Sequence, residues 1–223
     1  MPVTPVPHEG LDLVWGDCMV NRIAVIVTMI LFLLEISDLL SLMPHLFRCV
    51  TRWKGNLELE HSVSTARTRN TVALVIAMVL CLVVDRWGLI APSFKTELPA
   101  EWQLAVTAGI ITGYAVLRRL LYLASRFRSL ISEYDSCLRH CVYNYQILLS
   151  TLMLVSSLLL VIFRVPEGAA RVILLIETAM FVLLHVVRCG QILGSRCSII
   201  ATILYLCALE ILPLGILAFV STL

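Results

Sequence analysis

Six long apolar segments alternate with shorter polar connections along the 223-residue chain. Each segment is close to the roughly 20 residues that an α-helix needs to cross the hydrocarbon core of a bilayer. The pattern predicts an all-α fold, a polytopic transmembrane helical bundle of about six spans. In this prediction residues 1–20 form an extracytoplasmic N-terminal segment and residues 21–223 form one membrane domain. The predicted spans lie at about 23–42, 71–87, 102–124, 147–163, 172–187 and 198–220.

The composition agrees with a chain embedded in lipid. Apolar residues make up 60% of the sequence and charged residues 14%, with a mean hydropathy of +0.94, whereas soluble domains carry about a quarter charged residues. The lipid bilayer is therefore the first expected partner. A formal net charge of +2 gives no indication of a nucleic-acid partner. The proline-rich start MPVTPVPHEG lacks a positively charged region, so no removable signal peptide is expected.

The Lys and Arg residues predict the orientation in the membrane. Twelve of the seventeen lie in three connections, at 48–69, 118–139 and 188–196, and the other five flank the opposite ends of the spans. Because cytoplasmic loops carry an excess of Lys and Arg, these connections are predicted to be cytoplasmic and both termini to lie outside. Residues 44–70 are expected to include a short amphipathic helix at the membrane surface, anchored by Trp53. The trio Asp85-Arg86-Trp87 is expected to be a solvated end of the second span.

The last span carries one carboxylate, Glu210, near its centre. An ionisable side chain at that depth is costly unless it is paired, protonated or turned to a polar interior, so Glu210 is a candidate functional residue. Pro213 has no backbone N–H and leaves the carbonyl of Leu209 without its helical donor. On a regular α-helix, Tyr205 lies on a different face from Glu210. Three- and four-residue spacings place Glu210 on one face with Ile203, Leu206, Cys207 and Leu214.

Further polar residues lie in the first and fifth spans. Glu35 and Asp38 are three residues apart and share a helix face, which meets other helices or lies near the interface. Glu177, His185 and Arg188 follow neighbouring stripes of the fifth helix. They form either one polar face or three separate groups: a buried acid bonded to a neighbour, a histidine at the end of the span, and an arginine that reaches the interface.

The third span carries a ridge of small residues. Ala105, Gly109 and Gly113 recur every fourth residue, a spacing that lets another helix approach closely. Ordinary packing within the chain is the simpler expectation for this ridge, and dimerisation is the alternative.

Eight cysteines are scattered over the spans and connections, and they are expected to be free thiols. The densest group of metal-ligating residues lies in the second polar connection, at 125–146, where Cys137 and Cys141 share a helix face with His140 between them. No second pair with zinc-finger spacing follows. Neither a metal nor any other cofactor is therefore predicted, and these three residues are the candidates should a metal bind.

The run ILYLCALEILPL, from Ile203 to Leu214, resembles the closing signature of an uncharacterised polytopic family from Bacteroidota bacteria, one of the numbered domains of unknown function. Carried over by position, Tyr205, Cys207, Glu210 and Pro213 match that motif. Tyr145 stands where the family's pattern has a lysine. The resemblance implies an inner-membrane protein of that bacterial group and supplies no activity. Further similarity lies in the Arg-rich stretch 117–127, the pair Tyr143-Asn144, and Arg188.

Three functions are compatible with these features. The leading hypothesis is a structural or assembly subunit of a bacterial envelope complex, for secretion, motility or lipoprotein handling, whose partners are other membrane proteins or further copies of the chain. The alternative is a proton- or ion-coupled transporter of small solutes that uses the intramembrane acids. A lipid-active enzyme is the third. It is disfavoured, and no catalytic residue is named, because the sequence lacks HExxH, GxSxG and Gly-rich phosphate-loop motifs.

Overall fold

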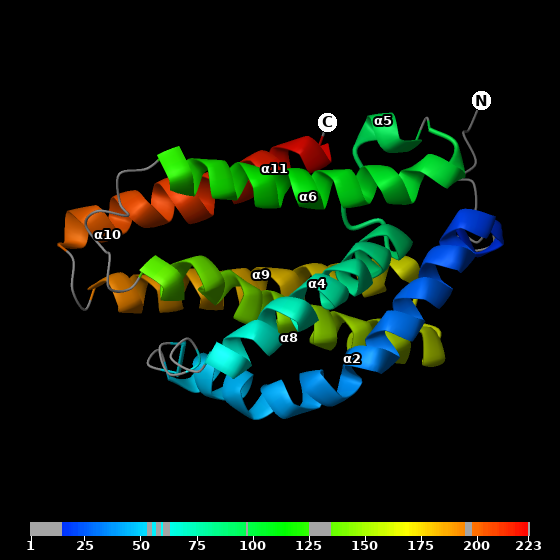
Figure 1. The fold of residues 1–223 in the computed structure, drawn as a ribbon. Coiled ribbons are helices and arrows are strands. Elements are labelled where there is room, and N and C mark those ends of the chain that lie inside the picture. The colour runs from blue at the N-terminus through cyan, green and yellow to red at the C-terminus, as the bar shows by residue number, and fades with distance from the viewer. Residues whose placement is uncertain are drawn as a thin grey trace.

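The chain is all-helical in the part that the computed structural model describes, namely residues 15–52, 55–56, 59, 63–96, 98–124, 135–194 and 198–222. Figure 1 shows long helices running back and forth along one direction. The helices are α2 (Met19–Thr51), α4 (Val63–Arg86), α5 (Ser93–Thr96), α6 (Ala100–Ala124), α8 (Asp135–Ile162), α9 (Glu167–Gly194), α10 (Ile199–Tyr205), the π-helix η1 (Leu206–Ile211) and α11 (Leu212–Thr222).

Six of these helical segments are long and apolar enough to cross a membrane, so the chain is a multi-pass membrane protein, as predicted. Most of them extend beyond the predicted limits because flanking polar residues continue the same helix. Helix α2 has 33 residues, roughly 50 Å at 1.5 Å per residue, whereas the hydrocarbon core is about 30 Å thick. The spans are Met19–Thr51, Ser64–Arg86, Ala100–Leu123, His140–Ile162, Glu167–Gly194 and Thr202–Val220.

Helix α4 lies at the centre of the bundle and packs against α2, α6 and α8. Helix α8 also packs along α9, and α9 contacts α10 and η1. In Figure 1, α6 and the α10–α11 run lie side by side above α4, α8 and α9. Buried side chains form two clusters. The larger joins α2, α4, α8 and the start of α9, and the smaller joins the start of α8, the end of α9, α10 and η1.

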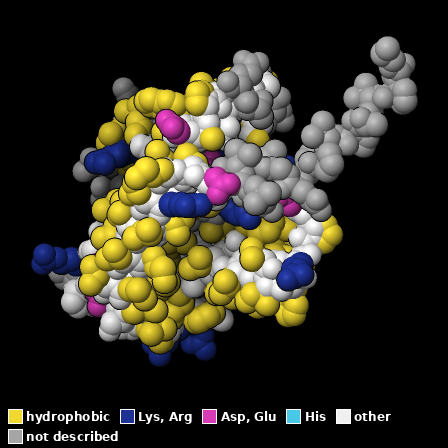
Figure 2. Space-filling model, turned by 90° about the vertical axis from the view of Figure 1, so that its right-hand side faces the viewer, with side chains coloured by type: hydrophobic (Ala, Val, Ile, Leu, Met, Phe, Trp, Pro, Cys, Tyr) yellow, Lys and Arg dark blue, Asp and Glu magenta, His cyan; other side chains and the backbone are white. Residues whose placement is uncertain are grey.

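The outer surface is largely apolar. Figure 2 views the end of the bundle at which α2 begins, and hydrophobic side chains cover most of the described surface there, with a few charged side chains between them. Helices α2 and α6 are the least covered, since only 11% and 6% of the residues in their apolar windows are buried inside the protein. Their outer faces are therefore open to lipid or to another membrane protein.

The surface helix predicted within 44–70 falls largely on residues outside those that the structure describes, so it stays a prediction. Helices α2 and α4 extend into this connection from both sides. Between them, Gly55, Asn56 and Leu59 are buried. Gly55 lies so close to the end of α2 that an added Cβ would be 2.7 Å from the carbonyl oxygen of Arg48. The connection therefore folds against the protein, while Trp53 lies outside the described residues.

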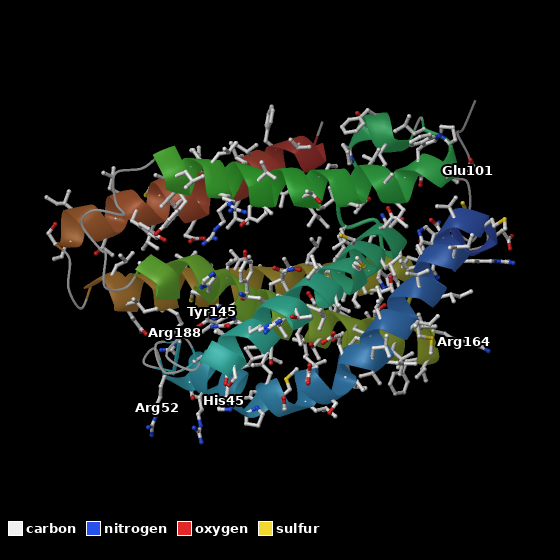
Figure 3. All side chains as sticks on the ribbon, in the orientation of Figure 1. His45, Arg52, Glu101, Tyr145, Arg164 and Arg188 are labelled. Carbon is white, nitrogen blue, oxygen red and sulfur yellow. The ribbon has the colours of Figure 1, made fainter. Side chains whose placement is uncertain are left out.

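Charged side chains gather at the two ends of the bundle. Figure 3 shows Arg52 and Arg188 at one end, and Glu101 and Arg164 at the other. Because the described residues contain six spans, an even number, the first of these spans begins and the last one ends on the same side. Which side faces the cytoplasm stays a prediction from the positive-inside rule.

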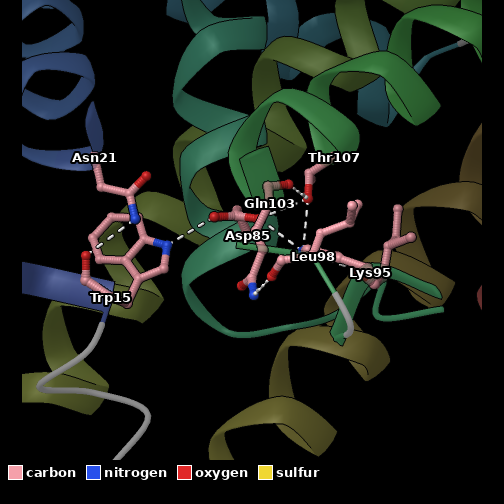
Figure 4. A network of polar contacts seen from close by, with 8 residues as sticks. Trp15, Asn21, Asp85, Lys95, Leu98, Gln103 and Thr107 are labelled. Carbon is pink, nitrogen blue, oxygen red and sulfur yellow. Dashed lines mark hydrogen bonds and ion pairs between the residues drawn. The ribbon is translucent and has the colours of Figure 1, made fainter. Parts of the chain in front are cut away.

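A buried polar network, the Asp85 network, closes the end of the bundle at which α4 ends (Figure 4). The Asp85 carboxylate accepts hydrogen bonds from Lys95 Nζ at 2.7 Å, Thr107 Oγ1 at 2.6 Å and Trp15 Nε1 at 2.7 Å. The side chains of Asp85 and Lys95 are 1% and 6% exposed. The expected solvated end is therefore wrong at Asp85, because α5, α6 and Trp15 cover the carboxylate.

Replacing Lys95 by Met should strongly destabilise the fold, because the Asp85 carboxylate would stay buried without its cation. Removing one partner of a buried ion pair costs about 3–5 kcal/mol. The matched control is Asp17→Asn, which breaks the Arg22–Asp17 pair, with side chains 63% and 70% exposed; exposed pairs contribute about 0–1 kcal/mol. The free energy of unfolding in mixed detergent micelles distinguishes the two variants. Equal losses would contradict a structural role for the Asp85 network.

Candidate functional site

Buried charges from the third, fifth and sixth spans meet in one cluster. Arg118 on α6 donates from Nη2 to Glu210 Oε1 at 2.6 Å and from Nε to Oε2 at 3.4 Å. His185 on α9 places Nε2 3.0 Å from Glu210 Oε2. The side chains of Arg118, His185 and Glu210 are 14%, 8% and 1% exposed. These three residues are called the charge cluster below.

The contacts of Glu210 indicate which atoms of the charge cluster donate hydrogen bonds and which accept them. A carboxylate that accepts hydrogen bonds from Nε and Nη2 on one edge of an Arg guanidinium is an acceptor, so we assign the N–H donor role to Nε2 of His185. In a neutral imidazole this tautomer leaves a lone pair on Nδ1. The positive charge of Arg118 then offsets the negative charge of Glu210, and this pairing makes the burial of both groups tolerable.

A π-helical turn carries Glu210. In η1 the backbone N–H of Leu212 bonds the carbonyl oxygen of Cys207, five residues back, whereas an α-helix bonds the fourth. Pro213, which has no N–H to donate, follows directly after this turn. Single π-turns within α-helices are rare and frequently mark functional sites.

The wide turn changes which residues face the interior. In a regular α-helix, with about 100° per residue, Tyr205 and Glu210 would point about 140° apart. The structure buries both, at 1% exposure each, and leaves Ile203 56% exposed. Cys207 is exposed as well. The prediction that Cys207 and Ile203 share a face with Glu210, and that Tyr205 does not, is therefore wrong, because it assumed a regular α-helix.

A second group of polar side chains adjoins the charge cluster through His185. The ligand atoms of Cys141 on α8, and of His185 and Cys189 on α9, all lie within 4.8 Å of one another, and all three residues are buried. The Sγ of Cys189 is 3.8 Å from each ring nitrogen of His185. This group is called the thiol-histidine cluster below. Two thiols and an imidazole are ligands that can hold a metal ion.

The metal-binding candidates predicted from the sequence, Cys137, His140 and Cys141, are not the three residues of the thiol-histidine cluster. Cys141 joins residues of α9, and His140 stacks on Tyr143 with the ring centroids 5.7 Å apart. The side chain of Cys137 lies outside the described residues. In the part of the chain that the structure describes, the cysteines are not joined in disulfides, as expected; they are Cys18, Cys49, Cys81, Cys141, Cys189 and Cys207.

Tyr145 and Arg188 join the site to the end of α2. The Tyr145 ring packs on His185 with centroids 5.3 Å apart, and its hydroxyl donates to the carbonyl oxygen of Cys49 at 3.2 Å. The Arg188 guanidinium donates to two backbone carbonyl oxygens in the last turn of α2. Figure 3 labels both residues toward the end of the bundle at which α2 ends. Arg188 therefore anchors α2 to α9.

The polar residues of the fifth span have separate partners. Glu177 accepts a hydrogen bond from Ser156 Oγ at 2.6 Å. His185 belongs to the charge cluster and Arg188 to the contact with α2. The continuous polar face is therefore wrong, and the three residues belong to separate groups. The details of the other interpretation hold only in part, because His185 is buried against Glu210 and Arg188 bonds α2.

The two acids of the first span, Glu35 and Asp38, have different surroundings. Glu35 is half-buried, and one of its carboxylate oxygens has no hydrogen-bond partner in the described part of the chain. It lies at a cavity of about 10 Å³ that Val72 and Ile76 of α4 also line. Asp38 is exposed. Glu35 therefore lies against another helix, whereas Asp38 is exposed on the outside of the bundle.

The small-residue ridge faces outward. Ala105, Gly109 and Gly113 are exposed, and a Cβ added at either glycine would meet no atom within 4 Å. The expectation that this ridge packs within the chain is therefore wrong over the residues that the structure describes. The internal contacts of α6 come from other residues, including Thr107 and Arg118.

Two residues of the site, Arg118 and Cys189, are not predictable from their local pattern. Arg118 is 92 positions from Glu210, and only the need of a buried acid for a partner points to a cation somewhere in the bundle. Cys189 offers a weak signal, because it follows His185 by four residues and so shares its helix face.

Glu210→Leu should destabilise the protein by about 3–5 kcal/mol, because Arg118 would stay buried without an acceptor. Arg118→Met should have a similar effect. The double variant should recover much of the loss, because apolar residues can replace a buried ion pair at little or no cost. A double-mutant cycle on the free energy of unfolding measures this coupling, and strictly additive losses would show that the two side chains act independently.

Comparisons with protein-family models, with curated proteins and with solved structures find no match for this chain.

Proposed function

We propose that the protein is a structural or assembly subunit of a bacterial envelope complex, and that it binds another membrane protein through the outer face of α6. The observation that carries the proposal is the open ridge of Ala105, Gly109 and Gly113. The bacterial inner membrane, and a role in secretion, motility or lipoprotein handling, rest on the resemblance of the last span to a Bacteroidota family.

The internal contacts of α6 fix which side of this helix faces outward. Thr107 bonds Asp85 and Lys95, and about three turns further along, roughly 16 Å away, Arg118 bonds Glu210. Eleven residues bring these two positions onto one stripe of the helix. Gly109 follows Thr107 by two residues and therefore points about 200° away from it. The two polar contacts hold the small residues on the open side.

An open ridge of small residues suits a helix partner better than it suits lipid. Lipid chains solvate a leucine surface as well as a neighbouring helix does, so a large apolar side chain there needs no partner. Glycine lowers helix stability by about 1 kcal/mol relative to alanine, but it allows a second backbone to approach closely and gain van der Waals contact. Because the space beside Gly109 and Gly113 is open, a transmembrane helix of another protein is the occupant that we propose.

The intramembrane charges support the same proposal. The charge cluster is paired within the chain, so its partners are provided internally. Asp38, in contrast, is exposed on α2, where a carboxylate gains from a polar group on a neighbouring helix. The surface of the membrane domain thus offers a close-packing face on α6 and a polar group on α2.

A photo-crosslinking side chain at Val116, which is 50% exposed and close to Gly113 on α6, tests the proposal in membranes of a source bacterium. We expect it to trap one other membrane protein that co-purifies near one-to-one with the chain. Gly109→Leu combined with Gly113→Leu should lower this yield at least about tenfold, equivalent to about 1.4 kcal/mol, because the added side chains block close approach.

Gly215→Leu is the matched control, since Gly215 is also an exposed glycine of a span with no atom within 4 Å of an added Cβ. It should leave the yield unchanged, and all variants should keep the parent's free energy of unfolding. Trapping only further copies of the chain, or an unchanged yield from the ridge variants, would contradict the assembly function.

A proton-coupled transporter is the second candidate, and the η1 turn favours it. Interrupted helices near the bilayer midplane build the substrate and ion sites of many transporters. Here the interruption carries an acid, Glu210, in contact with the imidazole of His185, a group that can take up and release a proton.

Glu210→Gln separates the two candidates. The amide keeps the size of the side chain and one oxygen acceptor for Arg118, but it has no negative charge and cannot carry a proton. If Glu210 relays protons, the variant should accumulate normally in the membrane and lose the proton flux that the parent chain shows in reconstituted vesicles containing a pH-sensitive dye. Equal flux for parent and variant, including no flux from either, would remove the transport candidate.

A further inference from the structure

We propose that Cys141, His185 and Cys189 bind one Zn²⁺ ion inside the membrane domain. The site lies between α8 and α9, with Glu210 and Arg118 behind the histidine. This inference goes beyond both candidate functions, since neither partner binding by α6 nor proton transfer by Glu210 requires a metal.

The spacing of the donor atoms fits a single metal ion. Zinc binds sulfur at about 2.3 Å and histidine nitrogen at about 2.0 Å, so a coordinated sulfur and nitrogen are about 3.5 Å apart at a tetrahedral angle and about 3.7 Å apart at a trigonal one. The Sγ of Cys189 is 3.8 Å from Nδ1 of His185. All ligand atoms, including Sγ of Cys141, lie within 4.8 Å of one another. The donor atoms are therefore within about 1 Å of the separations in a zinc site.

The helices present these ligands from two sides. His185 and Cys189 are four residues apart on α9 and share one face, and Cys141 comes from α8, which packs against α9. Measured over the whole residue, the exposed fractions of Cys141, His185 and Cys189 are 0%, 6% and 0%. A metal bound here is shielded from water and from lipid headgroups, and its ligands are held on helices instead of loops.

The second nitrogen of His185 is anchored in the way that metal-binding histidines usually are. Its Nε2–H donates to Glu210 at 3.0 Å, and Arg118 holds the carboxylate in place. A metal-binding histidine commonly donates its other N–H to a carboxylate, which fixes the tautomer and makes the coordinating nitrogen more basic. The charge cluster therefore leaves the lone pair of Nδ1 available to a metal.

Charge balance favours zinc over copper. On binding, the two thiols release two protons, and the resulting thiolates offset the two positive charges of Zn²⁺. Arg118 offsets Glu210 and His185 stays neutral, so the whole assembly carries no net charge. Cu⁺ also prefers thiolates, but it would leave one uncompensated negative charge in a low-dielectric interior, which is costly.

The zinc content of the purified full chain tests the proposal. The protein would be solubilised in mild detergent under reducing conditions, loaded with Zn²⁺, freed of unbound metal and analysed by mass spectrometry. We expect close to one zinc per chain. Cys141→Ser and Cys189→Ser should each abolish binding, whereas Cys207→Ser, which removes an exposed thiol of η1, should not.

Histidine and carboxylate variants locate the site. His185→Gln should abolish zinc binding, while His140→Gln, which removes a histidine close to Cys141 on α8, should leave it intact. Glu210→Gln should keep the metal but weaken its affinity about 10–100-fold, the usual effect of altering a carboxylate behind a ligating histidine.

A measurement on the unaltered chain keeps the test valid even where a variant fails to fold. Zinc K-edge X-ray absorption should show two sulfur ligands at about 2.3 Å and a nitrogen ligand at about 2.0 Å. The proposal would be overturned by any of four results: substoichiometric zinc after loading, fewer than two sulfur ligands, metal loss in His140→Gln but not in His185→Gln, or a Cys141–Cys189 disulfide in protein isolated with its thiols trapped.

Discussion

In a bilayer, hydrophobic burial alone does not decide which face of an apolar helix turns inward, because lipid chains solvate apolar side chains as well as a neighbouring helix does. Polar contacts decide it in this protein. The charge cluster ties α6, α9 and the last span together, and the Asp85 network ties α4, α5 and α6 together at the end where α4 ends. Helix α6 belongs to both, although only 6% of its apolar window is buried. Its position and rotation therefore depend on a few ion-paired and hydrogen-bonded side chains more than on apolar packing.

The η1 turn lets the last span turn its polar residues toward the interior. In a regular α-helix, Tyr205 and Glu210 would point about 140° apart, and one of them would face lipid. The π-turn brings both inside, where Tyr205 packs in the smaller buried cluster and Glu210 reaches Arg118 and His185. Pro213 removes a backbone donor directly after the turn. The charge-assisted bonds of Glu210 offset this loss, so the irregular backbone and the charge cluster stabilise each other.

The number, type and approximate position of the spans are predictable from the sequence, because span length and hydropathy are requirements of the bilayer itself. Glu210 is recognisable as a residue that needs a partner for a similar reason, since an ionised acid is costly inside the membrane. The identity of the partner is not predictable, because Arg118 and Glu210 are 92 positions apart and only tertiary packing joins them. Local periodicity also fails where the backbone leaves the α-helical repeat, as at Cys207. A small-residue ridge has the same pattern whether it faces a helix of its own chain or, as in α6, the outside.

Helix α6 connects the interior of the membrane domain to its outer face. Arg118 and Gly113 are about one and a half turns apart on this helix, and Arg118 contacts Glu210, which contacts His185. A Zn²⁺ ion on Nδ1 of His185 would make its Nε2–H a stronger donor to Glu210 and so alter the hold of Glu210 on Arg118. Metal occupancy and the outer face of α6 are then linked through three side chains in direct contact. Linkage is reciprocal, so a partner that binds α6 more tightly when zinc is present must raise the affinity for zinc by the same factor. A zinc ion that only stabilises the pairing of α8 with α9 would show no coupling to the partner, and each ligand would leave the affinity for the other unchanged.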